Sequence, residues 1–195
     1  MSDDGLIERR VSGEQVFHGR LLDVRRDVVA LPDGQQATRE YIVHPGAVMI
    51  VPMLDNGLLL MERQHRYPVG RVLLEFPAGK LEAGEAIQRC AQRELAEETG
   101  YRATEWARAG ILHNAPAYAT EIIEIWFARG LTAGPRQLDE GEFIDLVQVD
   151  EAALDAAAGR GELTDAKTLI GLQWLQRWRA GSWPMPGPLQ WLAPI

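Results

Sequence analysis

The sequence predicts an α/β fold in which helices cover both sides of a mixed β-sheet, preceded by a small antiparallel β-sheet. Short apolar or alternating runs, typical of strands, recur along the chain up to residue 149. A helical segment at 85–99 interrupts them, and two further helical segments follow. Hydrophobic residues make up 46% of the 195 residues and charged residues 25%, which is enough apolar material for one sizeable core.

The first 44 residues are expected to form short strands. A strand-like stretch at 16–32 runs into the turn signal Pro32-Asp33-Gly34, and residues 37–44 form an antiparallel return. Because this segment has few large apolar residues, we expect it to pack on the main domain or on a second subunit. Residues 1–44 are therefore expected to form an N-terminal β-strand segment that does not stand alone.

The main domain is expected at residues 45–182, and its elements follow one another in a regular order. Strands are predicted at 46–54, 58–64, 72–79, 104–112, 121–129 and 143–149, and helices at 85–99, about 150–159 and about 165–180. Gly100 ends the first helix as a left-handed cap. Residues 183–195 are rich in proline and predict an extended tail.

Composition excludes several classes of function. The net charge of -8 argues against nucleic-acid binding, and the longest apolar run is too short to span a membrane. Cys90 is the only cysteine, so no intrachain disulfide can form, and a cytoplasmic location is expected. No serine stands in a Gly-x-Ser-x-Gly setting, and the four histidines are too scattered for a zinc site.

The helix at 85–99 carries carboxylates on its apolar side. At 100° per residue, one stripe contains Ile87, Cys90, Ala91 and Leu95. Glu94 and Glu98 point along this stripe, and Glu97 lies at its edge. Charges away from water are costly unless they are paired or bind a metal ion, and oxygen clusters of this kind suit Mg²⁺. The alternative is a solvated face on which Arg93 pairs with its neighbours.

The segment Gly79–Tyr101, GKLEAGEAIQRCAQRELAEETGY, resembles the Nudix signature at every defined position. The resemblance implies a Nudix hydrolase, an α/β/α sandwich that cleaves a nucleoside diphosphate linked to another moiety with Mg²⁺ or Mn²⁺. Glu94 and Glu98 would be the main metal ligands, joined by Glu97 and by the carbonyl of Ala78. The remaining signature residues would be structural, namely Gly79, Glu85, Arg93 and Gly100.

Features outside the signature resemble the ADP-ribose pyrophosphatase subfamily. Pro116 lies sixteen residues beyond Gly100, where that subfamily characteristically has a proline. The run QHRYPVGRVLLEFPAG resembles the segment that precedes the signature, and by this match Arg66 and Glu75 would hold the nucleoside end. Taken singly, Pro116 could equally be an ordinary loop proline, Arg66 a surface cation and Glu75 a strand-edge carboxylate.

Two more residue assignments depend on the same resemblance to the subfamily. The run LDEGEFIDLVQV resembles a loop and strand that supply a catalytic base, which makes Glu140 the base and Glu142 a second carboxylate near the metal. The alternative is an acidic turn of no special purpose. Relatives also use a small N-terminal sheet to build a swapped dimer, and Arg39 would contribute to the adenosine site there.

The leading hypothesis is Mg²⁺-dependent hydrolysis of ADP-ribose to AMP and ribose 5-phosphate by a homodimer. A nucleotide-sugar pyrophosphatase of the GDP-mannose type is the alternative enzyme, since relatives differ by a few nucleoside contacts. A non-catalytic ADP-ribose sensor is a hypothesis of another class. Sensors tend to lose signature carboxylates and to carry a DNA-binding extension, whereas this chain keeps the carboxylates and shows no basic patch.

Overall fold

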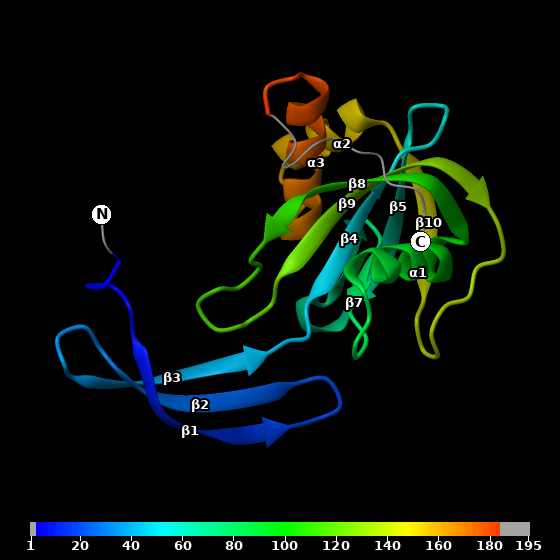
Figure 1. The fold of residues 1–195 in the computed structure, drawn as a ribbon. Coiled ribbons are helices and arrows are strands. Elements are labelled where there is room, and N and C mark those ends of the chain that lie inside the picture. Colours follow the sequence, from blue (N-terminus) through cyan, green and yellow to red (C-terminus); the bar gives the residue numbers. More distant parts are fainter. Residues whose placement is uncertain (1–2, 184–195) are drawn as a thin grey trace. The chain divides into compact units, whose positions relative to one another are not determined.

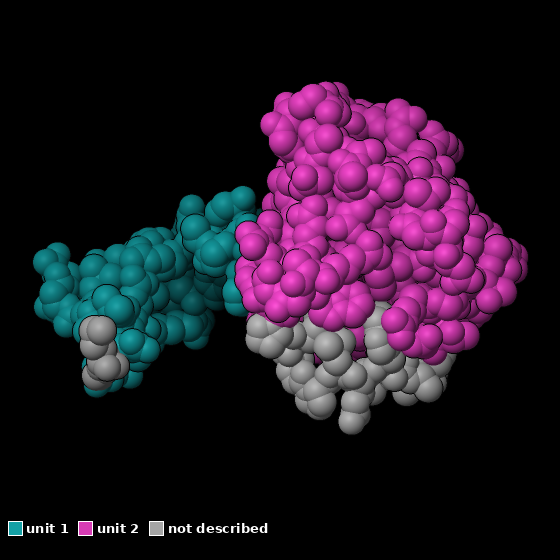
Figure 2. All heavy atoms as spheres, turned by 90° about the horizontal axis from the view of Figure 1, so that it is seen from above, with its two compact units in different colours: residues 1–46, 113–122 teal, residues 47–112, 123–195 magenta. Residues whose placement is uncertain are grey.

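The computed structural model describes residues 3–183, which divide into two compact units (Figure 2). The N-terminal unit contains the residues up to Gly46 together with His113–Ile122, and the main unit contains Ala47–Leu112 and the residues from Ile123 onward. Apart from Trp183, the predicted extended tail at 183–195 lies outside the described residues.

The N-terminal unit is built on a three-stranded antiparallel sheet in the order β1-β2-β3 (Figure 1). Its strands are β1 (Arg9–His18), β2 (Asp23–Ala30) and β3 (Gln36–Val43). The predicted turn before β3 is present, with Gly34 at a φ of 85°. The sequence analysis began the first strand-like stretch at residue 16, which was wrong. Strand β1 begins at Arg9, because the residues before 16 also pair with β2. Every residue of β1 is exposed.

The main unit contains two sheets. A four-stranded sheet has the order β7-β4-β9-β8, and a three-stranded sheet has the order β10-β5-β6. Their bounds are β4 (Ala47–Pro52), β5 (Leu59–Arg66), β6 (Arg71–Glu75), β7 (Ala78–Lys80), β8 (Tyr101–Leu112), β9 (Ile123–Ala133) and β10 (Ile144–Val149). Strand β4 runs parallel to β9 and antiparallel to β7, so the larger sheet is mixed, as predicted.

Helices cover both faces of the larger sheet (Figure 1). They are α1 (Ile87–Thr99), α2 (Glu151–Gly159) and α3 (Ala166–Arg179), with a short 3₁₀ turn η1 (Tyr67–Val69). Side chains of β4 alternate between the two faces. Val48 and Ile50 share a core cluster with Leu95 of α1, whereas Met49 and Val51 share one with residues of α2 and α3. This arrangement confirms the predicted α/β/α layering. None of the described helices is long and apolar enough to cross a membrane.

Several boundaries differ from the sequence prediction. The single strand expected at 72–79 is divided at Pro77, which has no backbone N–H to donate, into β6 and β7 of different sheets. Strand β9 covers Ile123–Ala133 rather than 121–129, because its pairing with β8 extends to Ala133. Helix α1 begins at Ile87 rather than Glu85, because Ala86 is extended and Glu85 uses its carboxylate to pair with Arg93. At this first helical position Ile87 is 40% exposed, so it is not part of the buried stripe. Strand β8 begins at Tyr101 rather than 104, since its pairing with β9 continues back to that residue.

Candidate metal and catalytic site

Helix α1 carries two glutamates on its buried face. Glu94 is 9% exposed and Glu98 is 5% exposed, and they share that face with Cys90, Ala91 and Leu95. The spacing of one helical turn places the two carboxylates one above the other. Burial raises the pKa of Glu94 to about 7. It raises the pKa of Glu98 further, and repulsion from neighbouring carboxylates adds to the effect.

Arg93 neutralises the acidic side chains beside this face. Its Nε and Nη2 each donate to Glu85 at 2.9 Å, and its Nη1 donates to Glu94 at 2.8 Å and to Glu97 at 3.0 Å. The guanidinium lowers the pKa of Glu85 to about 2. Arg93 therefore fixes the position of two predicted metal ligands and ties the helix to the loop that precedes it.

Strand β7 lies against the same carboxylates. The backbone N–H of Ala78 donates to Glu98 at 2.9 Å. A Cβ added to Gly79 would lie 1.9 Å from Cδ of Glu94, so only glycine leaves room for this carboxylate as it stands. From β7, Ala78 thus positions Glu98 through a hydrogen bond, and Gly79 leaves the space that Glu94 occupies.

Glu62 is a member of this cluster that the sequence analysis missed. It lies on β5, is 3% exposed, and its Oε1 has no hydrogen-bond partner among the described residues. Burial raises the pKa of Glu62, with repulsion from Glu142 and Glu75 in the same direction and Arg136 opposing it. Its charge also raises the pKa of Glu98.

The two carboxylates of the predicted base loop differ in position. Glu142 is half-buried and accepts a hydrogen bond from Gln64 at 3.3 Å. Its charge contributes to the raised pKa of Glu62, Glu94 and Glu98, so it faces the cluster. Glu140 is exposed on the same turn.

The predicted substrate-binding residues lie in two places. In the main unit, Arg66 makes a bidentate pair with buried Glu75, both bonds at 2.8 Å, and Lys167 also donates to Glu75. Burial opposes ionisation of Glu75, but these two cations outweigh it and lower its pKa. No sequence pattern singled out Lys167. In the N-terminal unit, Arg39 lies on β3, and its Nε donates to Glu8 at 2.9 Å.

The donor chemistry of the cluster fits a hard divalent cation. Glu62, Glu94 and Glu98 offer only carboxylate oxygens, and their raised pKa values show that their negative charges are under-compensated. Within residues 3–183, no three His, Cys, Asp or Glu side chains are close enough together to form a ready coordination shell. Binding of an ion would therefore require side-chain rotations, chiefly of Glu94 and Glu97 away from Arg93.

Two family models match the chain. The NUDIX domain matches residues 43–167, which include β4, α1 and the acidic turn before β10. The nucleoside diphosphate sugar hydrolase N-terminal domain matches residues 8–42, which include β1 and β2. Together the two matches run from the N-terminal sheet to the start of α3.

Proteins similar to this chain match it over most of their length. An ADP-ribose pyrophosphatase of Bacillus subtilis (strain 168) is 40% identical over 174 residues, which cover 88% of this chain and 94% of that protein. A methanol dehydrogenase activator of Bacillus methanolicus is 39% identical over 173 residues, covering 87% of this chain and 92% of that protein. A crystal structure of an ADP compounds hydrolase matches with a TM-score of 0.80 at 26% identity, covering 89% of this chain and 95% of the other.

Proposed function

The chain belongs to the NUDIX family, and on this premise we propose that it hydrolyses the pyrophosphate bond of ADP-ribose to AMP and ribose 5-phosphate. One observation carries the proposal: Glu94 and Glu98 are buried on one face of α1, in a chain 40% identical to an ADP-ribose pyrophosphatase along 88% of its length. Buried carboxylates with raised pKa values are costly to a purely structural helix.

NUDIX hydrolases generally need divalent metal ions, and for this chain we propose Mg²⁺, with Mn²⁺ as a substitute. Glu94, Glu97 and Glu98 would hold the ion together with the carbonyl of Ala78. When bound, the ion offsets the charge of the phosphate oxygens and lowers the pKa of a bound water. Arg93 would keep its pair with Glu85 and its hydrogen bond to the carbonyl of Lys80, which ties the helix to β7.

The protein groups have separate tasks in this reaction. A carboxylate of the turn before β10 would accept the proton of the attacking water, with Glu140 as the base predicted from sequence and Glu142 as the carboxylate nearer the cluster. Arg66 and Glu75 would orient the nucleoside end, and their mutual bidentate pair holds both side chains in place beforehand. Arg39 would contribute from the N-terminal unit.

A substrate panel tests the proposal. With Mg²⁺ present, we expect kcat/KM for ADP-ribose well above the values for GDP-mannose, UDP-glucose, NADH and 8-oxo-dGTP, and complete loss of turnover with EDTA. A preference for GDP-mannose would keep the chemistry but overturn the nucleoside assignment. Tight ADP-ribose binding without turnover of any substrate would favour the sensor hypothesis.

The variant Glu98→Gln tests the metal assignment. Because this carboxylate lies at the centre of the cluster, its neutralisation should lower kcat by at least about a hundredfold while leaving the fold intact. Circular dichroism and thermal unfolding check the fold, and Glu82→Gln, at an exposed position before the helix, is the matched control. Activity retained in Glu98→Gln would show that the metal ion is held elsewhere.

We also propose that residues 1–44 form a dimerisation segment beside a hydrolase domain at 45–182, and that the N-terminal sheet packs against a second copy of the chain. Val11, Val16 and Phe17 of β1 are exposed large apolar side chains, as are Leu21 and Leu22 in the turn that follows. Such a surface on a thin sheet favours association. Sedimentation velocity should give a dimer for the wild type and a monomer for Phe17→Asp; a monomeric wild type would overturn this assignment.

A further inference from the structure

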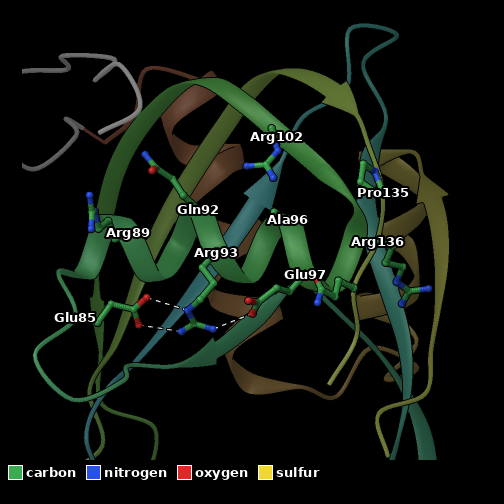
Figure 3. A pocket seen from close by; sticks show the side chains of 10 residues that line it. Glu85, Arg89, Gln92, Arg93, Ala96, Glu97, Arg102, Pro135 and Arg136 are labelled. Atoms are coloured by element: carbon green, nitrogen blue, oxygen red, sulfur yellow. Dashed lines mark hydrogen bonds and ion pairs between the residues drawn. The ribbon is translucent and has the colours of Figure 1, made fainter. Parts of the chain in front are cut away.

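A hollow of about 610 Å³ lies on the outer side of α1 (Figure 3). Arg89, Gln92 and Ala96 line it from positions three and four residues apart, which is the spacing of one helix face. Arg102 of β8 and the segment 135–137 after β9 complete the lining. The volume is that of a small-molecule pocket. Glu97, one of the three glutamates proposed to hold the metal ion, lines its edge, whereas the buried carboxylates of Glu94 and Glu98 do not.

The charge of this hollow is positive. Four arginines line it against two glutamates, and both glutamates, Glu85 and Glu97, are already paired with Arg93. Figure 3 shows Arg93 reaching toward those two glutamates on one side of the helix, with Gln92 and Arg102 on the other side. Arg89 and Arg102 are exposed and make no side-chain ion pair or hydrogen bond within the described residues. Two guanidinium groups therefore remain for an external partner.

Two buried donor atoms among the lining residues also lack acceptors. In the described part of the chain, neither Gln92 Nε2 nor Arg136 Nη2 has a hydrogen-bond partner. An unpaired buried donor is costly, and both of these atoms can only donate. Both are shielded from solvent, so a ligand in the hollow would accept from them only after the side chains of Gln92 and Arg136 turn toward it. The guanidinium of Arg136 also lies near Glu62, because its positive charge lowers the pKa of that carboxyl group.

The wall formed by residues 134–137 is tied to the end of α1. The backbone N–H of Gln137 donates to the carbonyl of Glu97 at 3.1 Å, and Gly134 donates to that of Gly100 at 2.7 Å. Arg136 Nε donates to the carbonyl of Glu98. These bonds satisfy carbonyls that would otherwise present negative partial charge near the hollow. The pocket is thus formed in advance and its electrostatics favour an anion.

We propose that this hollow is a second ligand site, separate from the buried carboxylates, which binds a phosphate monoester of nucleotide size. Guanidinium groups recognise phosphate oxygens through paired, charge-assisted hydrogen bonds, and Arg89, Arg102 and Arg136 line this hollow in addition to Arg93. A free phosphate ion would fill only a small part of 610 Å³, which leaves room for a sugar or base against Ala96.

The test measures binding in EDTA, so it is independent of any hydrolase activity. AMP and ribose 5-phosphate are titrated into ¹⁵N-labelled protein, with adenosine and inorganic phosphate as comparison ligands. We expect the phosphate monoesters to shift the amide signals of Gln92, Ala96, Arg102 and Gln137. The double variant Arg89→Ala/Arg102→Ala should raise the Kd by at least tenfold, because it removes two exposed cations without breaking any internal contact.

A control removes the same number of arginines elsewhere. Arg160 lies at the end of α2 and Arg177 on α3, and these helices cover the opposite face of the sheet. Arg160→Ala/Arg177→Ala should bind as the wild type does, although it also breaks the exposed pair between Arg160 and Glu162. Equal Kd values for the two double variants would overturn the proposal, as would shifts confined to residues of β7 and the buried face of α1. Adenosine binding as tightly as AMP would exclude phosphate recognition, and inorganic phosphate binding equally well would exclude a ligand of nucleotide size.

Discussion

At the scale of single residues, the cluster contains one carboxylate that the sequence could not reveal. Glu62 follows the apolar run Leu58–Met61, where a glutamate is usually the solvent-exposed end of a strand. It is buried instead, opposite the equally buried Glu75 of the neighbouring strand β6, on a face of the sheet that the strand pattern alone does not identify. By contrast, the helical period alone predicted the buried positions of Glu94 and Glu98, since they follow the apolar stripe of α1.

The variant Glu62→Gln should stabilise the metal-free protein and weaken metal binding. Burial and neighbouring carboxylates disfavour the charge of Glu62, so its neutralisation should raise the free energy of unfolding by about 1 kcal/mol at pH 8. The same change removes negative charge that attracts a cation. Thermal unfolding in EDTA and calorimetric titration with Mn²⁺ measure the two effects. A lower melting temperature in EDTA would mean that Glu62 is ionised and compensated in the folded protein.

The two carboxylates of the base loop can be separated by a matched pair of variants. Glu140→Gln should lower kcat by roughly a hundredfold or more with a much smaller effect on KM, because a general base acts in the chemical step. Glu142→Gln should weaken metal binding as well, since Glu142 faces the cluster. Steady-state kinetics and Mn²⁺ titration distinguish them. An unchanged kcat in Glu140→Gln would transfer the base role to Glu142.

At the scale of elements, the site depends on the close approach of β7 to α1. Sequence analysis identified both segments because one signature spans them, but it gave Gly79 only a structural role without saying what requires a glycine there. In the structure the requirement is one of space, because the carboxylate of Glu94 occupies the position of a Cβ. The backbone at Gly79 does not have a positive φ, so alanine is conformationally allowed there.

Gly79→Ala should therefore keep the fold and displace the carboxylate of Glu94. We expect the Kd for Mn²⁺ to rise by roughly 10–100-fold, with little change in melting temperature, because the clashing atoms are the end of a flexible side chain. Gly159→Ala is the comparison, since a Cβ there meets open space and its φ is not positive. An unchanged Kd in Gly79→Ala would show that Glu94 does not bind the ion from its present position.

At the scale of the whole molecule, sequence patterns predicted the layered main unit better than the N-terminal unit. A short apolar run with β-branched residues and flanking turn signals, such as β4, predicts a buried strand. Strand β1 has no regular apolar pattern, since Val11, Val16 and Phe17 are scattered among polar residues, and all of its residues are exposed in the single chain. Its extent therefore follows from its pairing with β2. The lining of the hollow outside α1 was also beyond sequence analysis, because it joins side chains from α1, β8 and the segment after β9.

The metal-free protein should lose stability as the pH rises from 5 to 8. Burial raises the pKa of Glu94 from 4.5 to about 7, and those of Glu62 and Glu98 shift in the same direction. Over this range the folded state holds more protons than the unfolded state, so the free energy of unfolding falls with rising pH, by an amount on the order of 1–3 kcal/mol. The lowered pKa of Glu85 acts in the opposite sense, but only below its ordinary value of 4.5.

Mg²⁺ should reverse this trend, because metal binding requires deprotonated carboxylates and grows stronger as protons leave. Saturating Mg²⁺ should therefore stabilise the protein most at pH 8 and least at pH 5. Urea unfolding at four pH values, with EDTA and with Mg²⁺, measures both curves. Metal-free stability that rises steadily from pH 5 to 8 would show that the buried glutamates are ionised and compensated within the chain itself, and would remove the electrostatic reason for a cation at this cluster.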